Sequence, residues 1–254
     1  LVGTVASGKS LLLARNSIVN LGELDAKVVD APRIGLMHSG AKKLTYNCYK
    51  NCINDAGGHL GCFDHYALTD KDAASLMSTV DALIIPGSSS GDTSSRASCD
   101  NRVAKAAMNQ GKFILGICYG HQRVNTILGG KKTTVTTTYG PSIQHKISSG
   151  GVNVGLLSEA HKISIVPGST LARLLKDTVA MVNTSHKYST YKIAAGLKVT
   201  AKAPDGVVES LEGDSFIGVQ FHPEYLYGYM KKEQFLPIFE YLVEMAGKTN
   251  KNLF

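Results

Sequence analysis

The chain has 254 residues, enough for one large domain or two small ones and enough to bury a core without metals or disulfides. Hydrophobic residues make up 43% and charged residues 19%, which excludes a disordered or fibrous protein, and the apolar runs are too short for a transmembrane helix. The net charge is +7, but Lys and Arg are scattered and Trp is absent, so we expect neither nucleic acid nor membrane as a partner.

The first 32 residues are predicted to be an N-terminal extension, with helical spacing at residues 11–21. Residues 3–10 match the phosphate-loop pattern Gly-x4-Gly-Lys-Ser. A phosphate loop needs a buried strand before it, and only two residues precede this one. We therefore interpret the match as coincidental.

From residue 33 onward, short apolar strands alternate with helical patterns. Strands are predicted at residues 33–38, 59–63, 81–87 and 113–117, and helices at residues 46–55, 70–78, 102–109 and 122–128. Parallel strands need such helical crossovers, so this half predicts an α/β fold with a mostly parallel central sheet flanked by helices.

After Gly129 and Gly130 the pattern changes to alternating segments joined by turns. Strands are predicted at residues 131–138, 163–166, 197–203, 207–211 and 216–221, with a turn at 204–206 and a last helix at 232–245. We expect this C-terminal antiparallel region to complete a single domain over residues 33–254.

Cys118 stands in Gly-Ile-Cys-Tyr-Gly-His-Gln, residues 116–122, between an apolar strand and a helical pattern. Gly-x-Cys-x-Gly at a strand-to-helix junction is the cysteine form of a nucleophile elbow, in which flanking glycines permit a strained turn. The helix N-terminus would favour the thiolate. Taken alone, the pattern is also compatible with a buried structural cysteine.

His222 ends the last predicted strand in Val-Gln-Phe-His-Pro-Glu, residues 219–224. Side chains alternate along an extended chain, so the carboxylate of Glu224 is expected on the same side as the imidazole. An imidazole oriented by a carboxylate can move the protons of nucleophilic catalysis. A lone histidine beside a proline would otherwise be structural.

Together these two motifs resemble the class I glutamine amidotransferase superfamily, and the resemblance runs from about Arg33 to the end of the chain. Within the superfamily the chain is most similar to the gamma-glutamyl hydrolase branch, through residues 182–186, 196–201 and 205–209. The resemblance implies the same α/β fold, no cofactor and no metal.

The resemblance also implies a role for each matching residue. Cys118 would be the nucleophile, His222 the general base and acid, and Glu224 the orienting carboxylate. The implied oxyanion residues are Gly87, Ser88 and Tyr119, and the implied substrate-binding residues are Gln122, Ser185 and His186. The chain departs from the hydrolase branch at Ser88, where a glycine is usual, at Tyr119, where arginine is common, and at Lys187, where a second histidine is common.

The expected function is cysteine-dependent hydrolysis of a gamma-glutamyl amide bond in a small substrate, through a thioester on Cys118. The first alternative is a glutaminase subunit that supplies ammonia to a separate synthase, because residues 119–122 are closer to the glutaminase elbow. A catalytically silent binding relative is the second alternative. The sequence leaves the amine side of the substrate and any homo-oligomer open.

Four further cysteines raise two other interpretations. Cys48, Cys52, His59, Cys62 and His65 supply enough soft ligands for zinc, although core packing is the simpler interpretation. In an exported protein, Cys48, Cys52, Cys62 and Cys99 would form disulfides and leave Cys118 free. The compartment stays open, because the family favours the cytoplasm whereas the apolar start without Met is compatible with export.

Overall fold

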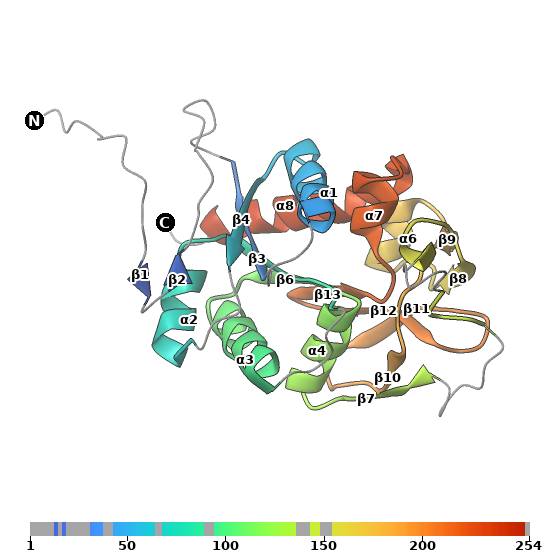
Figure 1. Cartoon of the computed structure of the whole chain (residues 1–254), viewed down its shortest axis with the longest axis horizontal. Helices are drawn as coiled ribbons and strands as arrows, with labels where there is room; N and C mark the ends of the chain where they lie inside the picture. Colours follow the sequence, from blue (N-terminus) through green and yellow to red (C-terminus); the bar gives the residue numbers. More distant parts are fainter. Residues whose placement is uncertain are drawn as a thin grey trace, which may run out of the picture.

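The computed structural model describes residues 13–14, 17–18, 31–37, 43–63, 68–88, 94–135, 143–147 and 154–251. Its centre is a nine-stranded sheet in the order β4-β3-β5-β6-β13-β12-β11-β8-β9 (Figure 1). The strands of this sheet are β3 (Arg33–Met37), β4 (His59–Phe63), β5 (Ala82–Ile85), β6 (Phe113–Ile117), β8 (His161–Ile165), β9 (Val179–Val182), β11 (Lys198–Lys202), β12 (Val208–Gly213) and β13 (Phe216–Val219).

The sheet has a parallel half and an antiparallel half that meet at β13. Strands β4, β3, β5, β6 and β13 run parallel, whereas β12, β11, β8 and β9 each run antiparallel to the preceding neighbour. This arrangement confirms the predicted fold class. Val219 pairs with Ile117, so the carboxyl ends of β13 and β6 lie side by side. The two sequence motifs therefore follow neighbouring strands at one edge of the sheet.

Helices cover both faces of the sheet (Figure 1). On one face lie α1 (Lys43–Asp55), α7 (Pro223–Gly228) and α8 (Leu236–Lys251), and on the other α2 (Asp70–Met77), α3 (Ser94–Asn109) and α4 (Tyr119–Ile127). The side chains of the buried strand β5 pack against both helix layers, because successive side chains point to opposite faces of the sheet. Ile84 packs in the cluster that contains Tyr49 of α1 and Phe239 of α8, whereas Leu83 packs with Val103 of α3.

Helix α2 shows how local sequence sets an element boundary. Thr69 precedes the helix and accepts a hydrogen bond from the backbone N–H of Asp72 at 3.2 Å, while the Asp72 carboxylate accepts one from the backbone N–H of Thr69 at 2.9 Å. This reciprocal capping box satisfies two backbone donors that have no partner within the helix. The helix predicted at residues 70–78 is therefore confirmed, with its last residue at Met77.

Several elements differ from the sequence prediction. The predicted helix at residues 11–21 is wrong where the structure describes it, because β1 (Leu13–Ala14) and β2 (Ser17–Ile18) form a short antiparallel pair. Helix α3 starts eight residues earlier than predicted, at Ser94. Elements the sequence did not indicate are β9, β10 (Tyr188–Lys192), α6 (Thr170–Leu175), α7, η1 (Val154–Leu156) and η2 (Glu233–Phe235). Strand β10 pairs with β7 (Lys131–Thr134) in a separate two-stranded sheet.

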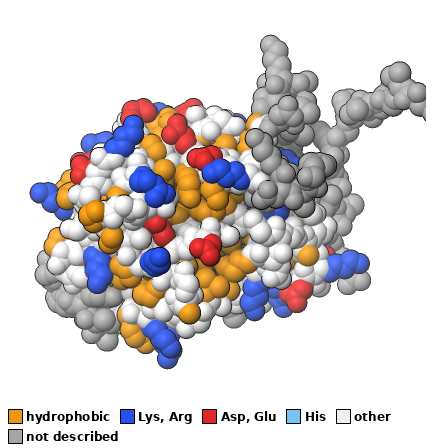
Figure 2. Space-filling view, turned by 180° about the vertical axis from the view of Figure 1, so that it is seen from behind, with side chains coloured by type: hydrophobic (Ala, Val, Ile, Leu, Met, Phe, Trp, Pro, Cys, Tyr) orange, Lys and Arg blue, Asp and Glu red, His pale blue; other side chains and the backbone are white. Residues whose placement is uncertain are grey.

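The lengths of the described helices and the charges on one face of the molecule bear on its possible partners. None of the helices in the described ranges is long and apolar enough to span a bilayer. On the face shown in Figure 2, the Lys and Arg side chains are distributed among acidic, apolar and uncharged groups instead of forming one basic patch. The expectation of no nucleic-acid partner stays a prediction.

Candidate active site

Cys118 lies in the turn between β6 and α4, with φ 52° and ψ −101°. A positive φ is rare for a residue with a side chain and costs on the order of 1–3 kcal/mol. The turn is fixed on both sides, because the Cys118 N–H donates to the Val219 carbonyl at 2.8 Å and the Cys118 carbonyl accepts from the Gln122 N–H at 3.2 Å. The predicted strained strand-to-helix turn is confirmed.

The two glycines around Cys118 are required by close backbone approaches. A Cβ added at Gly120 would lie 1.8 Å from the Ile85 carbonyl oxygen, and one added at Gly116 would lie 2.8 Å from the Gly120 carbonyl carbon. Neither position has room for a side chain, since real Cβ contacts below 3.0 Å are essentially never seen. The glycines thus let α4 start directly above the end of β5, with Cys118 at its N-terminus.

His222 and Glu224 form a close buried pair. His222 Nδ1 lies 2.7 Å from Glu224 Oε1, and the two residues are 7% and 1% exposed. The expected proximity is confirmed, but its predicted reason is wrong: Glu224 does not continue an extended strand and instead lies in the first turn of α7, which Pro223 opens. Proline is well suited to that first helical position, because its missing N–H would have no partner there.

Asn183 holds the backbone of His222 in place. Its side-chain Oδ1 accepts from the His222 N–H at 2.8 Å, and its Nδ2 donates to the His222 carbonyl at 3.0 Å. A second Nδ2 hydrogen bond reaches the Leu156 carbonyl at 3.0 Å. In the sequence analysis, Asn183 contributed only to the family resemblance. It is 39 residues from His222 in the sequence, and no local pattern predicts this contact.

The imidazole of His222 lies between the thiol of Cys118 and the carboxylate of Glu224. Burial alone lowers the pKa of His222, but the Glu224 carboxylate and the Cys118 thiol, which also hydrogen-bonds the ring, outweigh burial and raise this pKa to about 10. The ring is therefore an imidazolium at neutral pH. A nucleophile, a proton carrier and an orienting carboxylate in this order can perform covalent acyl transfer.

Of the predicted oxyanion residues, Gly87 lies beside this ring, whereas Ser88 and Tyr119 both contact Arg96 of α3. A Cβ at Gly87 would lie 2.6 Å from His222 Cε1, so only glycine fits beside the imidazole. Ser88 Oγ accepts from Arg96 Nη1 at 2.9 Å, and the same guanidinium lies 4.7 Å from the ring centroid of Tyr119. Arg96 thus contacts both sides of the predicted oxyanion site. Sequence reasoning missed it, because it lies in the part of α3 that was not predicted.

The three predicted substrate-binding residues occupy different environments. Gln122, one turn after Cys118, donates from Nε2 to the Tyr188 carbonyl at 2.8 Å and to Gln220 Oε1 at 2.9 Å. Ser185 forms an isolated β-bridge with Lys146. His186 is 5% exposed, and its Nε2 lies 3.6 Å from Glu209 Oε1. Their role in substrate binding stays a prediction.

Comparison with known proteins identifies the family. The Peptidase C26 family matches residues 33–224, which include the Cys118 turn and the His222–Glu224 pair. The chain belongs to the Peptidase C26 family. It is therefore a class I glutamine amidotransferase-like hydrolase at the level of the family, as the two motifs predicted.

Individual relatives of this Peptidase C26 chain cover only part of it. Protein NtpR of Enterococcus hirae is 34% identical over 143 residues, 54% of this chain and 57% of NtpR, so the chain spans little more than half of that relative. Gamma-glutamyl-gamma-aminobutyrate hydrolase PuuD of Escherichia coli is 24% identical over 195 residues, 70% of this chain and 77% of PuuD. The glutaminase domain of Trypanosoma brucei CTPS, solved with bound acivicin, has the same fold, with a TM-score of 0.61, 18% identity and coverage of 85% of this chain and 94% of that domain.

The remaining cysteines of this C26 chain form no disulfide in the described residues, so the disulfides expected for an exported protein are absent there. Burial raises the pKa of Cys48 to about 12 and of Cys99 to about 11, and it also raises the pKa of Cys52. Such protonated thiols are poor nucleophiles and poor metal ligands. His65 of the suggested zinc set and the phosphate-loop match at residues 3–10 lie outside the described residues.

Proposed function

We propose that the protein hydrolyses a gamma-glutamyl amide bond through a gamma-glutamyl thioester on Cys118. The observation that supports this most strongly is the position of Cys118, in a strained turn at a helix N-terminus beside the His222–Glu224 pair. Membership of the Peptidase C26 family and the similarity to PuuD, a gamma-glutamyl-gamma-aminobutyrate hydrolase by name, support the same substrate class.

In the proposed reaction, the proton of the Cys118 thiol is held by His222 as the imidazolium, and the sulfur attacks the gamma-carbonyl carbon of the substrate as a thiolate. The carbonyl oxygen becomes an oxyanion, for which the backbone N–H groups of Tyr119 and of Gly87 or Ser88 are the proposed donors. The His222 imidazolium then gives its proton to the amine nitrogen, the carbon–nitrogen bond breaks, and the amine leaves. The thioester and a neutral imidazole remain.

Hydrolysis of the thioester restores the enzyme. His222 takes a proton from water, the hydroxide attacks the thioester carbonyl, and the carbon–sulfur bond breaks to release glutamate. Glu224 holds the ring through Nδ1 throughout, leaving Nε2 as the atom that exchanges protons. These steps use side chains and water alone.

The second candidate is a glutaminase subunit of a separate synthase, which the sequence Tyr119 to Gln122 favours. Coupled glutaminases are slow until a partner completes the oxyanion site, because misaligned donors lose about 3–4 kcal/mol of transition-state stabilisation. In this chain Arg96 already contacts Ser88 and Tyr119, which supports a site formed without a partner. The hydrolase is therefore the function we prefer.

A substrate panel tests the proposal. Glutamine, gamma-glutamyl amines, gamma-glutamyl peptides and polyglutamylated folate would be given at matched concentrations to the isolated chain, with Cys118→Ala as the blank. We expect a gamma-glutamyl amine or peptide to be hydrolysed faster than glutamine without any added protein. Turnover that appears only when a co-purifying synthase is added would decide for the glutaminase subunit.

A further inference from the structure

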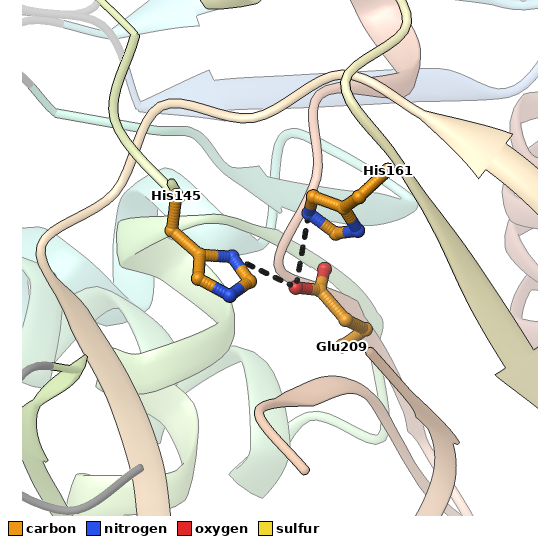
Figure 3. Close-up of side chains that lie close together, drawn as sticks. All are labelled: His145, His161 and Glu209. Atoms are coloured by element: carbon orange, nitrogen blue, oxygen red, sulfur yellow. Dashed lines mark ion pairs between the residues drawn. The ribbon is translucent and has the colours of Figure 1, made fainter. Parts of the chain in front are cut away.

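A second group of ionisable side chains is buried behind the candidate active site. His145, His161, His186 and Glu209, here called the histidine cluster, are 3%, 6%, 5% and 0% exposed. They come from four segments: residues 143–147, strand β8, the residues before β10, and strand β12. In Figure 3, His145 and His161 approach the Glu209 carboxylate from different parts of the chain.

Each imidazole uses one nitrogen for a hydrogen bond that faces away from the cluster. The partners are all acceptors: Asp205 Oδ2 at 2.9 Å from His145 Nε2, the Lys162 carbonyl at 3.1 Å from His161 Nδ1, and the Tyr188 carbonyl at 3.0 Å from His186 Nδ1. A nitrogen facing an acceptor must carry the hydrogen. In the neutral form of each ring, the other nitrogen therefore presents a lone pair toward the centre of the cluster.

With neutral rings and an ionised Glu209, the centre of the cluster contains acceptors without donors. His145 Nδ1, His161 Nε2 and His186 Nε2 lie 3.7, 3.7 and 3.6 Å from Glu209 Oε1. None of these four atoms has a hydrogen-bond partner in the described part of the chain. Buried polar atoms are nearly always satisfied, so the arrangement calls for a cation at its centre.

The distances match the ligand spacing of a tetrahedral metal ion. Zinc binds imidazole nitrogen and carboxylate oxygen at about 2.0–2.2 Å, which places neighbouring ligand atoms about 3.4 Å apart. The nitrogens of His145, His161 and His186 lie only a few tenths of an ångström farther than that from Glu209 Oε1. The ligand atoms of His145, His161 and Glu209 all lie within 4.8 Å of one another, so these three residues form the core of the site. Hydrogen bonds on the far nitrogens, as seen here, are what orient metal-binding histidines.

We propose that His145 Nδ1, His161 Nε2 and Glu209 bind one Zn²⁺ ion and that His186 Nε2 completes a closed structural site, in place of the substrate-binding role that the resemblance implied for His186. Four protein ligands leave no open position, and three imidazoles with one carboxylate suit zinc better than Mg²⁺ or Ca²⁺. The Glu209 carbonyl accepts from the Gln220 N–H at 2.8 Å, so the site braces the strand that leads to His222. It also fixes residues 143–147 to β8 and β12.

Metal analysis of the full chain, purified without a histidine tag or chelator, tests the site directly. We expect about one zinc ion per chain by plasma mass spectrometry after growth with zinc and gel filtration. Removal by a strong chelator should lower the melting temperature, and zinc should restore it, because a ligand that binds the folded state stabilises it. Less than about a tenth of an ion per chain, with no thermal response to added zinc, would overturn the proposal.

Cobalt substitution and matched variants locate the ion. Co²⁺ in the wild-type protein should give the intense visible bands of tetrahedral coordination, a readout that needs no variant. Glu209→Gln and His161→Ala should lose most of the bound metal, whereas His59→Ala, a half-buried histidine on β4, should keep it. Unchanged metal content in both cluster variants, or an octahedral cobalt spectrum, would contradict the assignment. Because the cobalt spectrum is recorded on the wild-type protein, the test still decides if a variant fails to fold.

Discussion

The state of His222 results from two opposing effects on one ring. Burial disfavours its charge, while the Glu224 carboxylate and the Cys118 thiol favour it and raise the pKa to about 10. In the proposed reaction the ring is thus charged before the substrate binds and can donate a proton to the leaving amine. Because the folded pKa is raised, this charge stabilises the fold fully below the unfolded pKa of about 6.5, and the stabilisation is lost as the pH rises through about 10.

Glu224→Gln should lower the pKa of His222, because the amide keeps the shape of the side chain and removes its charge. We expect the histidine titration seen by NMR to move to lower pH and kcat to fall roughly 10²–10⁴-fold, the usual contribution of an oriented general base. Lys248→Gln, at an exposed position on α8, serves as the charge control. An unchanged His222 titration in Glu224→Gln would show that the carboxylate does not hold the imidazolium.

Cys118→Ala should lower kcat/KM by roughly 10⁶-fold, the size typical of removing a nucleophile. Cys52→Ala and Cys62→Ala are matched controls, since neither residue is in a disulfide and neither lies in the strained turn. Cys52 is fully buried, so its variant should cost about 1–3 kcal/mol of stability and keep turnover. Rates of the three variants on one gamma-glutamyl substrate check this. Activity in Cys118→Ala, or its loss in both controls with the fold intact, would refute a unique role for Cys118.

At the scale of elements, the turn between β6 and α4 depends on the contact of Gly120 with Ile85. Gly120→Ala should destabilise the protein strongly and abolish turnover, because its Cβ would overlap the Ile85 carbonyl. Gly247→Ala, inside α8, meets its nearest atom at 3.9 Å and should be neutral or stabilising by about 0.5–1 kcal/mol. Thermal unfolding of the two variants compares these effects. Equal stability would mean that the close approach does not constrain the turn.

Helix α3 contributes Arg96, which contacts Ser88 and Tyr119 of the proposed oxyanion site. Arg96→Ala should reduce turnover by mobilising Ser88 and Tyr119, and it should cost about 3–5 kcal/mol, because it takes the guanidinium away from the buried Asp100 carboxylate 3.3 Å away. Arg96→Ala with Asp100→Asn should recover part of the stability but not the turnover. Full activity of the double variant would show that Arg96 does not position the loop.

The elements that were predicted correctly carry strong local signals. The strands β3, β5 and β6 are short apolar runs bounded by turn residues, and β6 leads into a glycine-flanked cysteine. Strand β10 is polar and pairs outside the main sheet, and α6 has only six residues, so neither has enough periodicity to be recognised. The contact of Arg96 with Ser88 depends on where α3 begins. The sequence prediction placed that start eight residues too late.

At the scale of the molecule, the parallel half of the sheet positions Cys118 and the antiparallel half positions the histidine cluster. The active-site motifs could be predicted because each is contiguous and follows a strand at the same sheet edge. The histidine cluster could not, because its ligands come from four segments with no common spacing. Those segments come together only in the folded protein. The sequence analysis therefore suggested the closely spaced cysteines as a metal site instead.

The covalent intermediate is the most direct test of the proposed function. The isolated wild-type chain would be mixed with a gamma-glutamyl amine, quenched in acid within the first turnover, and measured by intact-protein and peptide mass spectrometry. We expect a gamma-glutamyl adduct on the peptide that contains Cys118, no adduct in Cys118→Ala, and release of the amine before glutamate. Steady hydrolysis of the substrate without an adduct, or hydrolysis that persists in Cys118→Ala, would contradict the account.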